Sequence, residues 1–251
     1  MTIPSDLLDR FDREIRYRRP SKGLLARFLR WSMPKDPGAL YVPPRVAHII
    51  VTARGSVWRF LPIAALMMAC TVGLIILLLQ VPFLRPSAVG LLTQLFGLFL
   101  PQGWATGLAW GVGICTIVGL GPLVERSDFQ RMLDNQPASK SGVYNAWLRL
   151  ALWEEVAFRA GCEKWTWLER IRASMVFGVV HVINIWYSFA AGVALSLTGF
   201  GFLLVYLWDY RRTRNQVSAT AYSGVVHAVY NTLAMSLILV LVVVSILLRF
   251  V

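Results

Sequence analysis

Residues 61–84 read LPIAALMMACTVGLIILLLQVPFL, and none of these 24 residues is charged. A helix that crosses the hydrocarbon core of a bilayer needs about 20 mainly apolar residues. This stretch therefore predicts a membrane-spanning helix. A cleavable signal peptide has its apolar segment within about the first 30 residues, so we expect the helix to be retained as the first span.

The composition of the whole chain agrees with a membrane protein. Hydrophobic residues make up 57% of the 251 residues and charged residues 15%, whereas a soluble domain carries about 25% charged residues. This balance argues against a water-soluble globular protein. Cys70, Cys115 and Cys162 show no CxxC spacing, so we expect buried free thiols rather than a disulfide framework.

The positive charge of the chain is concentrated in its first part. The net charge is +12, and residues 1–60 carry 12 Lys/Arg and 5 Asp/Glu. Most other basic residues lie in short segments between apolar stretches, which is typical of an inner-membrane protein facing an anionic leaflet. The pattern does not favour nucleic acid as a partner. We expect a basic cytoplasmic or interfacial region over residues 1–60 and a transmembrane bundle in the lipid bilayer over residues 61–251.

A second apolar stretch is too long for one crossing. Residues 86–124 contain 39 uncharged residues, which would form a helix of about 58 Å. The sequence Pro101-Gln102-Gly103 offers a break. We therefore expect a short span or a re-entrant segment over residues 87–100 and a full span over residues 104–123.

The later apolar stretches complete the count of spans. Residues 143–162 predict one helix, and the 36 residues 173–208 predict two helices with a turn near residues 188–192. Residues 215–248 predict either one long tilted span or two short ones. The basic loop 211–214 should be cytoplasmic like the amino-terminal region, which requires an even number of spans between them; this division gives six. The sequence thus predicts an all-α polytopic membrane bundle of about 7–8 spans, with a cytoplasmic amino terminus.

The predicted helix near residues 148–162, LRLALWEEVAFRAGC, carries charges inside an apolar stretch. Glu154, Glu155 and Arg159 would each cost about 2.5–3.5 kcal/mol at the bilayer centre. Glu155 and Arg159 are four residues apart, so they can pair on one helix face, whereas Glu154 must face elsewhere. These charges indicate either a structural ion-pair cluster or a catalytic carboxylate held beside a Glu–Arg pair.

Two of the three histidines also lie in apolar stretches. His181 has Asn184 three residues later, and His227 shares a helix face with Asn231. A single intramembrane histidine is more often a hydrogen-bond partner between helices. Two histidines together with carboxylates, amides and an arginine on three helices favour one shared polar cavity.

This set of side chains has the chemistry of a hydrolase. A carboxylate and an imidazole that share one water act as a general base, and an imidazole with a carboxamide can stabilise an oxyanion. Glu154, His181 and His227 also have the donor types of a catalytic zinc site. However, the chain contains no H-E-x-x-H motif.

Three short motifs in this order resemble one known family. The sequence contains E-E-x-x-x-R at residues 154–159, F-x-x-x-H at residues 177–181 and H-x-x-x-N at residues 227–231. Their order and apolar setting resemble the CPBP (Abi) family of intramembrane proteases, which includes the type II CAAX prenyl endopeptidases. The resemblance covers about residues 143–240.

The resemblance implies a role for each motif residue. Glu154 and His181 would activate water, and His227 and Asn231 would stabilise the oxyanion. No cofactor would be required, although a zinc-dependent version of the same protease remains an alternative. One departure from the family pattern is Ala160-Gly161-Cys162 followed by the charged Glu163-Lys164. The expected supporting residues are Glu155, Arg159, Phe177 and Asn184.

The sequence therefore predicts a membrane endopeptidase of the CAAX prenyl protease-like type. Its substrate would be a peptide or a lipidated protein, whose identity and cleavage position the sequence does not specify. A non-catalytic immunity or scaffold protein is the main alternative. A proton-coupled transporter is disfavoured because no pair of broken apolar segments recurs in two halves.

Overall fold

The computed structural model describes residues 16–17, 40–42, 44–120, 143–183 and 188–247. Within these ranges the secondary structure is helical, apart from the strands β1 (Arg16–Tyr17) and β2 (Leu40–Tyr41), which form one antiparallel pair. The all-α prediction is confirmed. Most of the predicted basic region, residues 1–15 and 18–39, lies outside the described residues.

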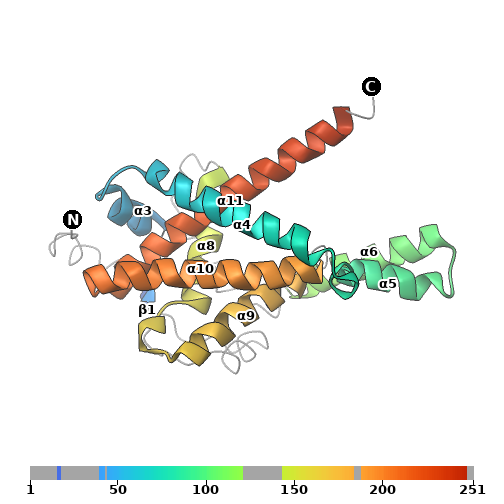
Figure 1. Ribbon diagram of the computed structural model, residues 1–251, viewed down its shortest axis with the longest axis horizontal. Coiled ribbons are helices and arrows are strands. Elements are labelled where there is room, and N and C mark those ends of the chain that lie inside the picture. Colours follow the sequence, from blue (N-terminus) through green and yellow to red (C-terminus); the bar gives the residue numbers. More distant parts are fainter. Residues whose placement is uncertain (1–15, 18–39, 43, 121–142, 184–187, 248–251) are drawn as a thin grey trace.

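Eight α-helices make up the described part of the chain (Figure 1). They are α3 (Pro44–Thr52), α4 (Leu61–Leu78), α5 (Ala88–Gly97), α6 (Gln102–Leu120), α8 (Val143–Phe158), α9 (Trp167–Ile183), α10 (Phe189–Thr213) and α11 (Gln216–Leu247). Three short 3-10 helices lie between them: η1 (Val57–Phe60), η2 (Pro82–Leu84) and η3 (Cys162–Lys164).

Two helical segments are long and apolar enough to cross a membrane. They are Val57–Leu78, which contains α4, and Phe189–Thr213, which is α10. Only 11% of the apolar window of the first segment is buried inside the molecule, and its Leu66 is 64% exposed. A helix that exposes so much apolar surface is better suited to lipid than to water. The membrane prediction is supported at this level.

The predicted break between residues 87–100 and 104–123 is confirmed. Helix α5 ends at Gly97 and α6 begins at Gln102, directly after Pro101. The two helices lie side by side and extend away from the other helices (Figure 1). With 10 residues, α5 is about 15 Å long, about half the thickness of the hydrocarbon core. Helix α5 is therefore too short to cross a bilayer by itself.

The apolar stretch 173–208 divides into two helices, as expected, but earlier than predicted. Helix α9 ends at Ile183 and α10 begins at Phe189. The hydroxyl of Ser188 accepts a hydrogen bond from the backbone N–H of Ala191 at 3.2 Å. Ser188 is thus an N-cap, so residues 189–192 form the first turn of α10 rather than a loop.

Helix α11 resolves the alternative left open for residues 215–248. It is one continuous helix of 32 residues, about 48 Å long. Its first half is packed among other helices, whereas exposed apolar side chains such as Leu239 and Leu247 occupy its second half. In Figure 1 this second half projects away from the other helices towards the carboxyl terminus.

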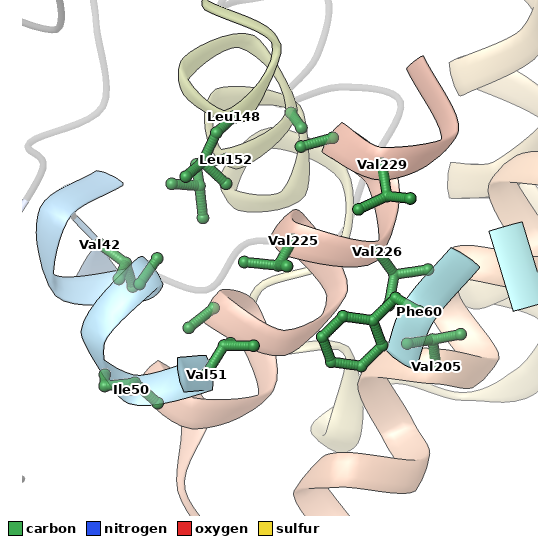
Figure 2. Packing of buried hydrophobic residues seen from close by; sticks show 14 of the residues in the cluster. Val42, Ile50, Val51, Phe60, Leu148, Leu152, Val205, Val225, Val226 and Val229 are labelled. Carbon is green, nitrogen blue, oxygen red and sulfur yellow. The ribbon is translucent and has the colours of Figure 1, made fainter. Parts of the chain in front are cut away.

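The main hydrophobic core surrounds the first half of α11 (Figure 2). It combines side chains from α3, α4, α8 and α10 with those of α11. Because α3 contributes fully buried residues, the packed bundle begins before residue 61. The labelled core residues in Figure 2 are Val42, Ile50, Val51, Phe60, Leu148, Leu152, Val205, Val225, Val226 and Val229.

The cysteines differ from one another in exposure. Cys162 is a buried free thiol, as predicted, but Cys70 is exposed, so the prediction of burial is wrong there. Cys70 lies on α4, much of whose surface no other part of the molecule covers. The side chain of Cys115 lies outside the described residues.

Candidate active site

The predicted pair on α8 forms one buried unit just past the end of the helix. Arg159 donates from Nη1 to Glu155 Oε1 at 2.5 Å, and both side chains are buried. The Nε of Arg159 also donates to the carbonyl oxygen of Gly199 on α10 at 3.2 Å. Its guanidinium lies over the rings of Phe177, at 4.5 Å, and Phe202, at 5.2 Å. The expected i, i+4 pair is confirmed, and it holds α8 against α9 and α10.

Two residues of α11 form the other hydrogen bonds of the Glu155 carboxylate. The hydroxyl of Ser223 donates to Glu155 Oε2 at 2.6 Å, and His227 Nδ1 lies 2.9 Å from Glu155 Oε1. Because both Glu155 oxygens already accept hydrogen bonds, the His227 nitrogen is the donor. Glu155 thus receives hydrogen bonds from an arginine, a serine and a histidine. A carboxylate with this many donors is a structural group and not an available base.

Glu154 points in a different direction and has different neighbours. Its Oε1 lies 4.0 Å from His181 Nε2, and its Oε2 lies 3.4 Å from His227 Nε2. The residue is only 8% exposed. Within the described part of the chain, its buried Oε2 has no hydrogen-bond partner. A buried polar atom without a partner costs about 1–3 kcal/mol, and more if it is charged, so this oxygen is suited to bind a water or a ligand.

The backbone fixes the orientation of His181. Its Nδ1 lies 2.7 Å from the carbonyl oxygen of Phe177, which can only accept a hydrogen bond. Nδ1 therefore carries the proton, and in the neutral ring Nε2 is the acceptor. This acceptor faces the Glu154 carboxylate. The phenyl ring of Phe177, with its centroid 4.4 Å from that of His181, supports the imidazole from the side.

Two acceptors that face each other at 4.0 Å do not bind each other directly. A water molecule has two O–H groups and can donate one to each acceptor. Positions about 2.8 Å from each atom, an ordinary hydrogen-bond distance, are available across a 4.0 Å separation. Glu154 and His181 are thus spaced to hold and orient one water molecule.

His227 lies between the two carboxylates. Its ring stacks on Phe202 with centroids 4.1 Å apart and planes 22° apart. Nδ1 is bound to Glu155, and Nε2 faces Glu154. The ring has little freedom to turn, because a hydrogen bond and an aromatic ring both hold it.

The structure brings most of the predicted site residues together. Six of them, from α8 and its end, α9 and α11, form one contiguous group that is buried except for the half-buried His181. Asn231 lies one helical turn after His227 on α11 and is partly exposed; it makes no hydrogen bond with the other described site residues. Asn184 lies outside the described residues. The six are Glu154, Glu155, Arg159, Phe177, His181 and His227.

Sequence reasoning missed three residues that shape the site. The sequence could have identified Ser223, since it lies four residues before His227 on the same face of α11. It could not have identified Phe202, because Phe202 is one apolar residue among many in α10. Gly199 was equally inconspicuous: a Cβ there would lie 2.7 Å from the ring of Phe177, so a larger residue would push that ring away from its place beside Arg159.

The residues after Arg159 turn the chain away from the site. Gly161 has φ +88°, a left-handed conformation that favours glycine, and its N–H donates to Tyr206 Oη at 3.2 Å. The hydroxyl of Tyr206 donates to Glu163 at 2.9 Å. The charged residue that departs from the family pattern is therefore bound to α10 and does not enter the site.

Glu154, His181 and His227 have the donor types of a zinc site. Among the residues that the structure describes, no group of three or more His, Cys, Asp or Glu side chains is arranged so that it could hold a metal ion. Comparison of the chain with protein-family models, curated proteins and solved structures gave no match. The interpretation of the site therefore rests on its geometry and on its motifs.

Proposed function

We propose that the protein is an intramembrane endopeptidase that hydrolyses peptide bonds with water activated by Glu154 and His181. One observation carries the proposal. Two adjacent buried glutamates differ sharply: Glu155 is fully hydrogen-bonded, whereas Glu154 is not and faces the unprotonated nitrogen of His181 across 4.0 Å. A purely structural cluster would have no reason to leave the second carboxylate unpaired.

The first chemical step uses the water held between Glu154 and His181. Hydrogen bonds to both acceptors direct the O–H groups of the water at the protein and leave a lone pair free to attack a carbonyl carbon. As the new C–O bond forms, Glu154 takes the proton of the water. Such general-base catalysis contributes about 10²–10⁴-fold to a rate.

The second step needs a donor for the oxyanion and a proton for the leaving amine. With its Nδ1–H bound to Glu155, His227 would donate to the oxyanion from Nε2 in its doubly protonated form. That N–H would then be bound by the oxyanion and not by Glu154 Oε2, which lies 3.4 Å away. Asn231, one turn later on α11, would be the second donor. When the tetrahedral intermediate collapses and the C–N bond breaks, the proton taken up by Glu154 passes to the amine.

The surroundings of the site favour a substrate associated with the membrane. The polar group lies among helices whose outer surfaces are apolar, and two segments are apolar enough to span a bilayer. We therefore propose a multi-pass protein of the inner membrane with a cytoplasmic amino terminus. Because α5 is too short to cross and α11 is one helix, we propose fewer spans than the predicted 7–8. Its substrates would be hydrophobic peptides or lipidated proteins of the kind cut by CAAX proteases.

The proposal is tested by hydrolysis in ¹⁸O-labelled water. The full chain is reconstituted in vesicles with a mixture of hydrophobic and prenylated peptides, and new carboxyl termini that carry ¹⁸O are measured by mass spectrometry. Glu154→Gln should lower their formation by at least about 10²-fold, while Glu169→Gln, at a half-buried position in the first turn of α9, should leave the rate per folded molecule unchanged. A Glu154→Gln variant that forms labelled termini as fast as the wild type would refute Glu154 as the base. Under the alternative of a non-catalytic immunity or scaffold protein, neither variant forms labelled termini.

A chelator experiment distinguishes the zinc-dependent version of this protease. Two imidazole nitrogens converge on one carboxylate, which is the donor set of catalytic zinc. In that case a chelator would abolish hydrolysis and added zinc would restore it. The water mechanism proposed here instead predicts a rate that chelators leave unchanged.

A further inference from the structure

One end of the bundle gathers cations and aromatic rings away from the candidate active site. The apolar segment Val57–Leu78 begins at this end, and Phe189–Thr213 finishes there. Arg54, just before the first segment, pairs with Asp209, near the end of the second, at 2.5 Å. If these segments cross a bilayer, their neighbouring ends lie at the same membrane surface.

Two aromatic rings with an arginine on either side form a row across this end. The guanidinium of Arg212 lies 4.5 Å from the ring centre of Trp208, and the ring of Trp208 lies 5.4 Å from that of Tyr222. The guanidinium of Arg59 lies 5.8 Å from the same tyrosine ring. The continuous row Arg212–Trp208–Tyr222–Arg59 therefore joins α10, α11 and η1, with an exposed cation at each end.

The positive charge of these two arginines is not neutralised locally. Both oxygens of the nearby Asp209 are occupied, by Arg54 at 2.5 Å and by Ser218 at 2.6 Å. Among the described residues, neither Arg59 nor Arg212 forms an ion pair with a carboxylate. Arg59 donates to the carbonyl oxygens of Val51 and Arg54, which leaves part of its five N–H groups for another acceptor.

The row continues into an apolar surface on α10. Leu197 is 58% exposed, Leu204 is 45% exposed and Trp208 is 48% exposed, and with Arg212 they follow one another at helical spacing on one face. Leucines that lead to a tryptophan and then an arginine are typical of a helix leaving a bilayer. The apolar residues face acyl chains, and the tryptophan lies at the headgroup level.

We propose that Arg59 and Arg212 bind the headgroups of anionic phospholipids at the membrane surface. The rings of Trp208 and Tyr222 lie between the two cations at headgroup level, and the acyl chains run along the exposed leucines of α10. Charge complementarity selects an anionic over a zwitterionic lipid, because two guanidiniums without carboxylate partners attract a net negative headgroup. The proposal requires a membrane but is independent of peptide hydrolysis.

Lipid retention by the full chain tests the site. The protein is purified in mixed micelles with equal amounts of phosphatidylglycerol and phosphatidylcholine, and retained lipids are measured by native mass spectrometry. The wild type should retain phosphatidylglycerol preferentially. Arg59→Gln/Arg212→Gln should lower this preference by about fivefold for each arginine, the factor expected for one interfacial cation.

Arg85→Gln is the matched control. Arg85 lies beyond the other end of α4, is exposed, and donates to the carbonyl oxygens of Leu79 and Gln80, much as Arg59 does at its own end. Its loss removes the same charge, so retention of phosphatidylglycerol should stay at the wild-type value. An equal loss in Arg85→Gln would mean that net charge alone attracts the lipid, and the site would be refuted.

The single variant Arg212→Gln separates binding from folding. Ring contact with Trp208 is its described interaction, so the variant should unfold in lipid-free detergent at the wild-type temperature while losing about fivefold in lipid preference. The proposal is overturned if the wild type shows no preference for phosphatidylglycerol. It is equally overturned if the double variant keeps the full preference.

Discussion

Two buried carboxylates in this protein are held in the same way at two places in the bundle. In each, an arginine donates to one carboxylate oxygen and a serine of α11 donates to the other. The lengths agree as well, with 2.5 Å to the arginine and 2.6 Å to the serine in both. The two sets are Glu155 with Arg159 and Ser223, and Asp209 with Arg54 and Ser218.

The difference lies in what adjoins each set. Next to Glu155 is a second carboxylate, Glu154, which faces His181 and His227 and lacks a hydrogen-bond partner on Oε2 among the described residues. Asp209 is surrounded instead by the rings and arginines of the bundle end. The paired carboxylates are structural elements, and the reactivity that we propose resides in Glu154, which the Glu155 set helps to position.

The largest expected effect comes from breaking the water-holding pair. His181→Ala should lower hydrolysis by about 10²–10⁴-fold, since Glu154 would lose the second acceptor that orients the water. Incorporation of ¹⁸O into new carboxyl termini measures this. Ser218→Ala, in the Asp209 set, should leave the rate per folded molecule unchanged. A His181→Ala rate within a few-fold of the wild type would contradict the proposed role.

Removing the arginine from either set should destabilise the fold. Arg159→Met and Arg54→Met each leave a buried carboxylate without its main counter-charge, which typically costs about 3–5 kcal/mol. Denaturant unfolding in detergent measures the loss. Only Arg159→Met should also reduce hydrolysis, because only Glu155 holds a histidine of the site.

A second substitution checks that charge is the cause. In Arg54→Met/Asp209→Asn the unpaired charge is gone, so part of the lost stability should return. If the double variant is no more stable than Arg54→Met, the apolar stem of the arginine and not its charge stabilises this end of the bundle.

The serines should have smaller and unequal effects. Loss of either hydroxyl leaves a buried carboxylate oxygen short of a donor, which costs about 1–3 kcal/mol. The loss of stability in Ser218→Ala should be nearer to about 3 kcal/mol, because Asp209 then keeps only its hydrogen bond from Arg54. The loss of stability in Ser223→Ala should be nearer to about 1 kcal/mol, because Glu155 keeps its hydrogen bonds from Arg159 and His227. The reverse order in denaturant unfolding would show that the two sets are not equivalent.

The sequence predicted the site better where the signal was local. The Glu155–Arg159 pair follows from a spacing of four on one helix, and His181 and His227 were found because a histidine is conspicuous in an apolar stretch. The Arg54–Asp209 pair joins residues 155 positions apart. The spacing of residues in the sequence cannot predict such a contact, because the contact forms only when α10 and α11 have packed against the end of α3.

The helices show the same limit. Apolar length and Pro101 predicted the break between α5 and α6, yet the ten residues of α5 were counted as a span. The position of the α10 start depended on the capping hydroxyl of Ser188, and the continuity of α11 depended on packing of its first half. Apolar composition predicts how many helical segments there are. It does not predict at which residue each helix begins or whether each helix crosses the membrane.

A third carboxylate extends the comparison to a site in water. Glu169 Oε2 accepts hydrogen bonds from the backbone N–H of Thr166 at 2.8 Å and from its hydroxyl at 2.9 Å, forming a capping box at the start of α9. These donors lower the pKa of Glu169. The charged carboxylate therefore stabilises the fold at a pH above its ordinary pKa, and this contribution is lost as the pH falls through the lowered pKa.

Glu169→Gln should show the smallest destabilisation of the series at neutral pH and none in acid. Thermal unfolding at neutral and at acidic pH measures this. A difference that persisted in acid would mean that the charge is not responsible, whereas its disappearance would show that the ionised carboxylate of Glu169 stabilises the start of α9.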